Sequence, residues 1–517
     1  MRRTFVLAIL DGWGIGKLDE SNPIYSAKPE TINFIRTNFP SCALQSAGNA
    51  VGLPWEEEGN SEVGHLTLGA GKILYQYFPR ISMAISDGSF FENPALKNAF
   101  AHSKKNNSAV HLVGLLTDGN VHASFEHLRA ILEMAKKEEC SKLYLQIFAD
   151  GKDSSPRSVI ALIKKLDMEM KKYGVGQVAS LSGRYFAMDR DNHWERTEAT
   201  YKVLTGINAN QKTTEELAQN AYDKNHDDEY IEPSAVNEAH PIKDDDAIIF
   251  FNFREDSMRQ ITEPFVSPSF TNFPIKKLEN IYTTTMTEYL DKFKVPVAFK
   301  KERAQDPLGK ILADKGKTQL RIAETEKYAH VTYFFNGLNE IAYQNEYRIL
   351  IPSRKDIDPT AHPEMMAHEI TERAIISLND GGFDFILINY ANPDVMAHTG
   401  NFSATTKAVQ FVDKELSRLI RSVLDQNHVL LITSDHGNAE SVINLKTGEP
   451  QTQHDPNPVP FYLVAKEYQG KGKNSADPLQ PLPVIGLLSD VAPTILELMN
   501  IPQPQEMTGQ SLLNQLL

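Results

Sequence analysis

Ser61 is the residue of this chain whose surroundings point most directly to chemistry. It lies in the turn-prone stretch Gly59–His65, and acidic and histidine side chains stand at the ends of apolar runs elsewhere in the chain. These metal-ligand candidates are Asp11, Asp394, His398, Asp435, His436 and His454. A serine hydroxyl is a poor nucleophile at neutral pH, and a bound cation lowers its pKa while a second cation can hold phosphoryl oxygens. The set therefore predicts a metal-activated serine that attacks phosphorus.

The spacing of the ligand candidates indicates how they would grip a metal. Asp394 and His398 are four residues apart, so one helical turn would put both on the same face, within reach of one cation. Asp435 and His436 are adjacent, which suits either two ions gripped from different sides or one ion in an irregular turn. Carboxylate and imidazole ligands without thiolates favour Mn²⁺ over Zn²⁺ or Mg²⁺. Each motif by itself also has a plain explanation, because strand-end aspartates commonly form turns and helix surfaces carry such pairs.

A second group of charged residues lies in the middle of the chain. Asp153 follows an apolar run, and the guanidinium groups of Arg184, Arg190 and Arg254 could clamp a carboxylate or phosphate bidentately. Asp153 near such cations could act as a general acid or base. The alternative is that these residues pair with one another in surface salt bridges. Lys327, considered by itself, is expected at the surface.

Short apolar runs that alternate with helical patterns predict the elements that position these residues. The expected strands are Phe5–Leu10, Val110–Leu116, Leu143–Phe148, Ala247–Phe253, Phe385–Asn389 and His428–Thr433. One expected helix has an apolar stripe from Val159 to Leu166, with Ser155 and Pro156 as its N-cap and first residue. The alternation predicts an α/β fold with mostly parallel sheet, whose ligands lie beyond the carboxyl ends of the strands. We expect residues 1–75 and 302–517 to form one domain and residues 76–301 to be a second α/β domain inserted into it.

Composition narrows the choice of partners and compartment. The 517 residues are 41% hydrophobic and carry a formal net charge of −14, so nucleic acid and anionic membranes are poor candidates. No apolar run approaches the roughly 18 residues of a membrane span. Two distant cysteines, Cys42 and Cys140, fit a reducing cytosol, and we expect a cytoplasmic protein. No G-x-G-x-x-G follows the first strand, which argues against a dinucleotide enzyme.

Eight sequence motifs, in order along the whole chain, resemble those of one known family. They are Leu10–Gly14, Gly59–His65, Leu115–His122, Arg184–Asn192, Ala323–Gly337, Asn389–Asp394, Ser434–Glu440 and Asn457–Phe461. The chain resembles the cofactor-independent (2,3-bisphosphoglycerate-independent) phosphoglycerate mutases of the alkaline phosphatase superfamily. The resemblance implies a phosphatase-like metal-binding domain with an inserted phosphotransferase domain that binds the substrate, and an active site in the cleft between them, which closes to exclude water.

The resemblance also implies roles for individual residues. One Mn²⁺ would be held by Asp394, His398 and His454, and the other by Asp11, Ser61, Asp435 and His436, with Zn²⁺, Mg²⁺ or Co²⁺ as alternatives. Ser61 would take the phosphoryl group from 3-phosphoglycerate, and the glycerate would take it back on its 2-hydroxyl. The implied substrate contacts are His122, Lys152, Asp153, Arg184, Arg190, Arg254 and Lys327. Asp153 would move protons and Lys327 would neutralise the phosphoryl group in a monomeric enzyme.

Two departures from the family pattern concern the substrate contacts. Ser257 stands where the family usually has a second arginine, and Lys152 replaces an arginine. A bidentate clamp at position 152 therefore becomes a point charge. These departures support a second hypothesis, that the chain is a metal-dependent phosphomonoesterase or a mutase that acts on another phosphosugar. A third hypothesis is a non-catalytic metal-binding protein.

Overall fold

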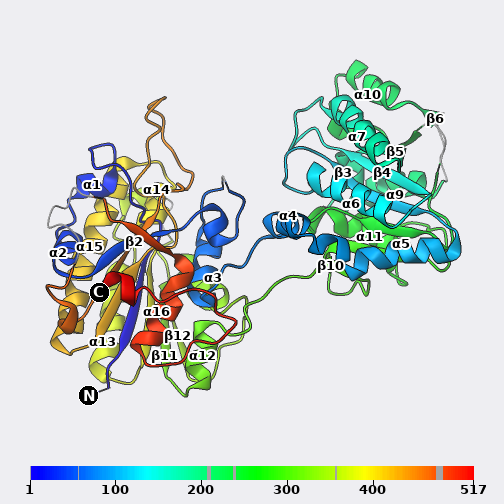
Figure 1. Cartoon of the computed structure of the whole chain (residues 1–517). Coiled ribbons are helices and arrows are strands. Elements are labelled where there is room, and N and C mark those ends of the chain that lie inside the picture. Colours follow the sequence, from blue (N-terminus) through cyan, green and yellow to red (C-terminus); the bar gives the residue numbers. More distant parts are fainter. Residues whose placement is uncertain (1, 56, 207–210, 237–239, 356–357, 473–480) are drawn as a thin grey trace. The chain divides into compact units, whose positions relative to one another are not determined.

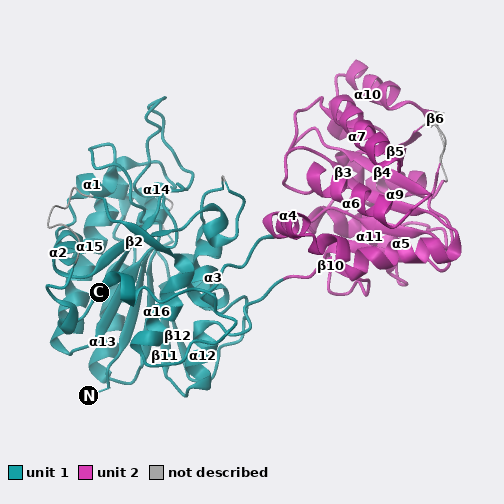
Figure 2. Ribbon diagram, viewed as in Figure 1, with its two compact units in different colours: residues 1–76, 302–517 teal, residues 77–301 magenta. Residues whose placement is uncertain are grey.

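The structure, a computed structural model, consists of two compact units (Figure 2). It describes residues 2–55, 57–206, 211–236, 240–355, 358–472 and 481–517. Unit 1 comprises Met1–Gln76 and Glu302–Leu517, and unit 2 is Tyr77–Lys301. Unit 1 is thus assembled from both ends of the chain.

Unit 1 is built on a sheet of eight strands (Figure 1). In spatial order they are β12 (Glu346–Ile351), β11 (Gln319–Glu324), β13 (Phe385–Tyr390), β1 (Phe5–Leu10), β14 (Val429–Thr433), β15 (Val459–Val464), β2 (Ser41–Gln45) and β16 (Val484–Leu487). The pairs from β12 to β14 are parallel, and β15 runs antiparallel to both its neighbours. The carboxyl ends of β11, β13, β1 and β14 consequently meet at one edge of the sheet.

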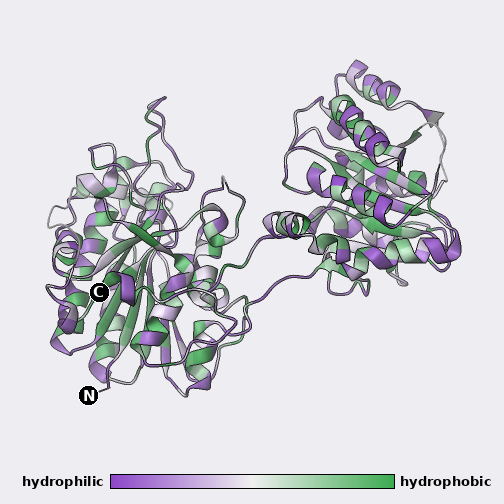
Figure 3. Ribbon diagram, viewed as in Figure 1, coloured by the Kyte–Doolittle hydropathy of each residue, from purple (hydrophilic) through white to green (hydrophobic). Residues whose placement is uncertain are grey.

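Both faces of this sheet are buried at its inner strands β13, β1 and β14. Side chains of a strand alternate between faces, and in β1 Val6, Ala8 and Leu10 join one apolar cluster while Phe5, Leu7 and Ile9 join the other. The helices of unit 1 are α1 (Pro23–Ala27), α2 (Glu30–Asn38), α3 (Ser61–Ala70), α12 (Leu308–Asp314), α13 (Ala367–Asp380), α14 (Asn392–Ala397), α15 (Phe402–Asp425), α16 (Val491–Leu498) and α17 (Leu513–Leu516). Figure 3 shows hydrophobic strands and helices of mixed hydropathy. A strand that is buried on both sides reads as a continuous apolar run, which is why β1 was visible in the sequence.

Unit 2 contains a second sheet of eight strands. Their spatial order is β10 (Val297–Phe299), β9 (Tyr282–Thr287), β8 (Ala247–Phe250), β3 (Val110–Leu116), β4 (Leu143–Ala149), β5 (Gln177–Gly183), β7 (Ser234–Val236) and β6 (Gln211–Lys212). All pairs from β10 to β5 are parallel, and β7 runs antiparallel to β5. The helices are α4 (Tyr77–Asp87), α5 (Pro94–Asn106), α6 (Phe125–Lys137), α7 (Val159–Tyr173), α8 (Arg184–Ala187), α9 (Trp194–Leu204), α10 (Thr214–Asp223) and α11 (Arg259–Val266). The predicted α/β class with mostly parallel sheet is confirmed.

Two local predictions in unit 2 are wrong in detail. The strand expected over Ala247–Phe253 ends at Phe250, because only its first four residues pair with neighbours. The helix expected to begin at Ser155 and Pro156 begins at Val159. Its first N–H groups are satisfied from elsewhere: Asp228 accepts from the backbone N–H of Ser158 at 2.7 Å and of Val159 at 2.8 Å.

In unit 1, the N-terminus of α2 is also capped by a residue that is distant in the sequence. Pro29 occupies its N-cap and makes no side-chain cap. Instead Asp413 of α15 accepts hydrogen bonds from Thr31 and Ile32, both at 2.9 Å. A capping residue that is hundreds of positions away in sequence cannot be found by scanning for local helix-start patterns.

Within the part of the chain that the structure describes, no helix is long and apolar enough to cross a membrane.

Replacing Asp413 with alanine should lower the free energy of unfolding of unit 1 by about 1–2 kcal/mol, because two buried N–H groups lose their acceptor. Thermal unfolding followed by circular dichroism measures the effect. Asp425, exposed at the end of the same helix, provides the control substitution Asp425→Ala, which should leave the midpoint nearly unchanged. Equal midpoints for both variants would contradict the capping role.

Unit 2 should lose stability on mild acidification because of His127. Burial lowers the pKa of this histidine to about 3, whereas in the unfolded chain it lies near 6.5. Between about pH 6.5 and pH 3, His127 is protonated in the unfolded chain but neutral in the folded protein. The free energy of unfolding therefore decreases as the pH is lowered through this range. The slope from His127 is at most about 1.4 kcal/mol per pH unit.

The variant His127→Gln tests this dependence. Its unfolding free energy should change less between pH 7 and pH 4.5 than that of the unmodified protein. His226→Gln, a change at an exposed histidine of the same unit, should keep the original dependence. If His127→Gln shows the full acid dependence, another group is responsible.

Candidate metal centre and active site

The predicted metal ligands of unit 1 meet at the carboxyl edge of its sheet. β1 lies between β13 and β14, so Asp11, the Asp394 helix and Asp435 follow three adjacent parallel strands. Gly12 permits the close approach: its φ is +71°, and a Cβ there would lie 2.9 Å from the Cα of Asp394. Two groups have ligand atoms within 4.8 Å of one another: Asp394, His398 and His454, and Asp11, Asp435 and His436.

The first group has two imidazoles prepared to bind a cation. His398 directly follows α14, and its Nε2 lies 3.3 Å from Oδ1 of Asp394, as the four-residue spacing predicted. The Nδ1 of His398 contacts the carbonyl of Thr452 at 2.9 Å, and that of His454 contacts the carbonyl of Gly59 at 2.8 Å. A carbonyl only accepts, so each Nδ1 donates and each Nε2 keeps its lone pair. These two Nε2 atoms face each other at 3.0 Å, an arrangement that needs a cation or a proton between them.

The second group surrounds the hydroxyl of Ser61. Ser61 Oγ donates to Oδ1 of Asp11 at 3.2 Å and lies 3.0 Å from Nε2 of His436. The Nδ1 of His436 contacts the carbonyl of Gly437 at 3.2 Å, so the ring is fixed like those of the first group. Asp435 and His436 both join Asp11 in this group.

Ser61 is the first residue of α3. Asn60 caps the helix by accepting from the N–H of Val63 at 3.1 Å. The first N–H groups and the dipole of a helix favour an anion at its N-terminus. A phosphoryl group on Ser61 would therefore lie where the backbone already favours negative charge.

Lys327 is part of the same centre. The expectation from residue type alone, that it lies at the surface, is wrong: its side chain is 7% exposed. Its Nζ donates to Ser61 Oγ at 2.6 Å and to carboxylate oxygens of Asp11 and Asp394, both at 2.7 Å. Burial opposes its charge, but these carboxylates and that of Asp435 raise its pKa above the ordinary value. Lys327 therefore places a positive charge beside Ser61 Oγ.

The charge of the centre fits two divalent ions. Asp11, Asp394 and Asp435 are each at most 3% exposed, and one ammonium leaves them with a formal charge of −2. Uncompensated buried charge is costly. Two divalent cations would bring the sum to +2, which a phosphoryl dianion balances. Oδ2 of Asp435 is also buried, with the ring of His65 at 3.0 Å.

Three further residues fix the carboxylates, and residue-by-residue reasoning did not assign them a role. Asn389 donates to Asp11 at 2.8 Å, and Asn438 donates to Asp394 at 2.7 Å. His65 lies 3.0 Å from Oδ2 of Asp435 and accepts from Asn389 at 3.0 Å. Asn389 is near the carboxyl end of β13, and His65 lies one helical turn after Ser61, so strand-end and helix periodicity were the available signals.

In unit 2, three of the six predicted substrate contacts, His122, Asp153 and Arg184, also lie together. Arg184 contacts Asp150 at 2.6 Å and Asp153 at 2.9 Å, and His122 lies 3.8 Å from Asp153. Burial and the nearby Arg184 lower the pKa of His122 to about 4, so it is neutral at pH 7. The group combines a carboxylate, a neutral imidazole and a guanidinium beyond the ends of β3, β4 and β5.

The remaining cations of unit 2 are held by carboxylates. Asp256, which the sequence reasoning did not single out, pairs with Arg190 at 2.5 Å and with Arg254 at 3.1 Å. Lys152 is 64% exposed and pairs with Glu229 at 3.4 Å, outside this group. Arg184 thus lies with Asp153, as expected for residues that contact one substrate. Arg190 and Arg254 form salt bridges with Asp256, as the alternative predicted.

The two departures from the family pattern can be located. Ser257 is buried, and its Oγ lies 3.0 Å from Nδ1 of His122. Where the family usually has a second arginine, this chain therefore has a serine that contacts the imidazole of His122. Lys152 extends to the surface and Glu229.

Comparisons with known proteins agree with this geometry. Residues 81–291 match the family model described as BPG-independent PGAM N-terminus, and residues 205–457 match that of type I phosphodiesterase / nucleotide pyrophosphatase. The chain is 44% identical to 2,3-bisphosphoglycerate-independent phosphoglycerate mutase 1 of Methanosarcina acetivorans and 43% identical to the 2,3-bisphosphoglycerate-independent phosphoglycerate mutase of Clostridium perfringens, with 99% of each chain covered. The crystal structure of Leishmania mexicana phosphoglycerate mutase at low cobalt concentration aligns with a TM-score of 0.57 and 28% identity, over 99% of this chain and 97% of that one.

The fold and the ligand groups define an α/β protein of the alkaline phosphatase superfamily. Within that class, identities above 40% over the full length are decisive. The chain belongs to the family of 2,3-bisphosphoglycerate-independent phosphoglycerate mutases.

Removing one histidine of the first group should weaken the binding of one metal ion. In His454→Ala, we expect the affinity for one of two bound Mn²⁺ ions to fall by at least about a hundredfold, because a ligand is lost outright. Isothermal titration of the metal-free protein measures both ions. The control His368→Ala alters a side chain that is 64% exposed and should bind two ions as before. A His454→Ala protein with two undisturbed sites would exclude His454 as a ligand.

Proposed function

We propose that this enzyme interconverts 3-phosphoglycerate and 2-phosphoglycerate through a phosphoserine on Ser61. The observation that carries the proposal is the position of Ser61 Oγ, within 3.2 Å of Asp11, His436 and Lys327 at the start of α3. A hydroxyl surrounded by hard-metal ligands and a permanent ammonium is suited to accept a phosphoryl group.

In the first step, Ser61 Oγ gives up its proton to solvent and forms a bond to phosphorus, while the bond between phosphorus and the 3-oxygen of the substrate breaks and the 3-oxygen takes a proton from Asp153. Lys327 contacts Ser61 Oγ and offsets the negative charge of the transferred group. The N-terminus of α3 acts in the same sense. In the second step, the 2-hydroxyl of glycerate attacks the phosphoserine and restores the free hydroxyl of Ser61.

We assign one Mn²⁺ to Asp394, His398 and His454, and the other to Asp11, Ser61, Asp435 and His436. When bound, such ions lower the pKa of a coordinated hydroxyl and stabilise negative charge on phosphoryl oxygens. Asn389, Asn438 and the backbone carbonyls behind the histidines hold the ligand side chains in place.

We assign the recognition of glycerate to unit 2. Arg184, Arg190 and Arg254 supply guanidinium groups for carboxylate and phosphate, and His122 supplies a neutral imidazole. Asp153 is the proposed proton carrier: the departing 3-oxygen must gain a proton and the attacking 2-hydroxyl must lose one. The guanidinium of Arg184 lies 2.9 Å from Oδ2 of Asp153 and the neutral imidazole of His122 lies 3.8 Å from it, so this carboxylate is held among the residues proposed to bind glycerate.

A second candidate, hydrolysis of the phosphoserine or a mutase reaction on another phosphosugar, is supported by Ser257 and Lys152. Ser257 binds His122 and Lys152 pairs with Glu229, so neither offers substrate the bidentate clamp usual in the family. Release of inorganic phosphate faster than isomerisation would favour this candidate.

The compartment and the assembly state remain proposals. Both cysteines, Cys42 and Cys140, are free thiols, which supports a cytoplasmic enzyme. We propose a monomer, which light scattering coupled to size exclusion would test.

The variant Ser61→Ala should lower the mutase rate by at least about a thousandfold, because it removes the hydroxyl that contacts Asp11, His436 and Lys327. An enolase-coupled assay with 3-phosphoglycerate and Mn²⁺ measures the rate, and phosphate release is followed in parallel. The control Ser422→Ala changes a serine of α15 that lies outside both metal groups. Mutase activity of Ser61→Ala near that of the control would refute the phosphoserine route.

A further inference from the structure

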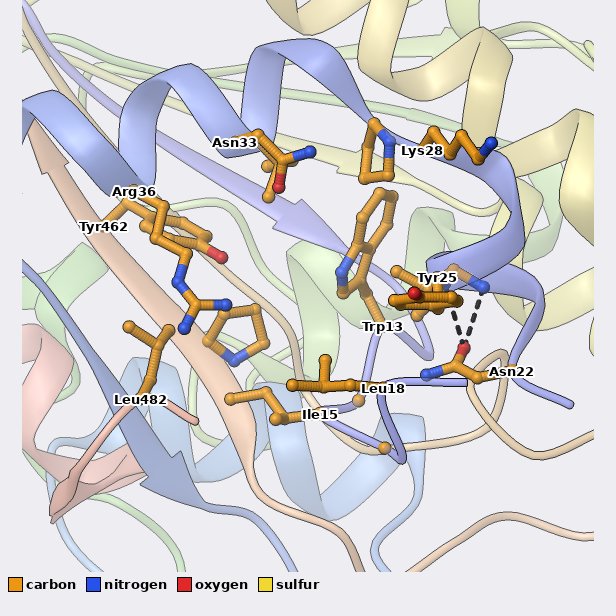
Figure 4. Close-up of a pocket in the computed structure, with 16 residues that line it drawn as sticks. Trp13, Ile15, Leu18, Asn22, Tyr25, Lys28, Asn33, Arg36, Tyr462 and Leu482 are labelled. Atoms are coloured by element: carbon orange, nitrogen blue, oxygen red, sulfur yellow. Dashed lines mark hydrogen bonds between the residues drawn. The ribbon is translucent and has the colours of Figure 1, made fainter. Parts of the chain in front are cut away.

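Unit 1 contains a pocket that the proposed reaction does not use (Figure 4). It lies among α1, α2, β15 and the loop that follows β1, and its volume is about 180 Å³. Its walls include Trp13, Ile15, Ile32, Arg36, Tyr462 and Leu482. None of these residues belongs to either group of metal ligands.

The size and the walls of the pocket fit one aromatic ring. A cavity of about 150 Å³ with aliphatic and aromatic walls holds a benzene molecule, so this pocket has room for one ring and a small substituent. Trp13 is 3% exposed and presents its ring at the centre of the pocket (Figure 4). Aromatic rings pack favourably against one another, and most residues lining a small-molecule site are apolar.

The charge of the pocket indicates which substituent a bound ring would carry. Arg36 of α2 reaches over the pocket opposite Ile15 and Leu18 (Figure 4). Its Nε is buried and has no hydrogen-bond partner among the residues that the structure describes. No aspartate or glutamate belongs to the described lining, in a protein whose net charge is −14. A buried donor of a permanent cation without an anion beside it is a site for one, and a guanidinium fork matches a carboxylate.

We propose that this pocket binds a small aromatic carboxylate, with its ring against Trp13 and Tyr462 and its carboxylate on Arg36. The loop of the pocket is continuous with the metal centre: the N–H of Trp13 donates to Ser434 at 2.9 Å, one residue before Asp435. The site is nevertheless separate from Ser61, and ligand binding to it does not depend on the proposed function.

Binding of phenylacetate to the full-length protein tests the proposal. Saturable quenching of tryptophan emission, absent in Trp13→Phe, together with isothermal titration, should give one site per chain. Arg36→Met keeps the length of the side chain but removes its charge, and it should weaken binding by at least about tenfold. Arg373→Met, at an exposed arginine of α13, should bind as the unmodified protein does. Benzylamine, which has a ring of the same size and the opposite charge, should bind at least about tenfold more weakly than phenylacetate.

A second variant keeps the test valid if Arg36→Met is unstable. Ile15→Phe retains the arginine but fills the space for the ring, so it should abolish phenylacetate binding while the thermal midpoint stays close to that of the unmodified protein. Unchanged phenylacetate affinity in both variants, or equal affinity for benzylamine, would overturn the proposal. A crystal structure with phenylacetate bound elsewhere and this pocket empty would do the same.

Discussion

The concentration of negative charge at the carboxyl edge of the unit 1 sheet is the constraint on which the rest of the structure depends. Asp11, Asp394 and Asp435 are buried within a few ångströms of one another, with one ammonium between them. Such a centre is stable only with further positive charge, which explains the burial of Lys327. It also explains the lowered pKa of Asp394: burial raises this pKa, but Lys327 and the nearby histidines lower it by more. The phosphoryl group then enters a site whose charge balance it completes.

The sheet supplies this geometry through register. β13, β1 and β14 are adjacent and parallel, so the residues that directly follow each strand lie close together at one edge of the sheet. Close backbone approach is equally necessary. A Cβ on Gly64 would lie 2.5 Å from the carbonyl oxygen of Asp435, so α3 can bring Ser61 to the centre only with glycine at that position.

The sequence allowed the strands that are buried on both faces to be predicted, because they read as unbroken apolar runs. Phe5–Leu10 and Val110–Leu116 were predicted to the residue. Strands with mixed polarity, such as β9 with its four threonines and β11 with the buried Arg321, gave no such signal. Thr284 and Thr287 of β9 donate to the carbonyls of Pro296 and Phe253, which no local sequence pattern reveals. The same is true of the helix caps that Asp413 and Asp228 supply.

For the candidate site, strand-end position identified Asp11 and Asp435, and helical spacing identified Asp394 with His398. Lys327 could not be placed by its residue type, since only the assembled carboxylates make its burial favourable. Asp256 and Asn389 were missed for a related reason: each acts by holding another functional side chain. Residues of that kind become visible only when the partners are seen together.

The discontinuity of unit 1 has a consequence for how the protein is made. β1 lies between β13 and β14, which are synthesised more than 370 residues later, whereas unit 2 is one continuous segment. On the ribosome, every strand of the unit 2 sheet is synthesised before β13 and β14. The unit 2 sheet can therefore form while β1 has neither of its neighbouring strands. Ser61, the proposed nucleophile, therefore leaves the ribosome early but gains its full set of charged partners only near the end of translation.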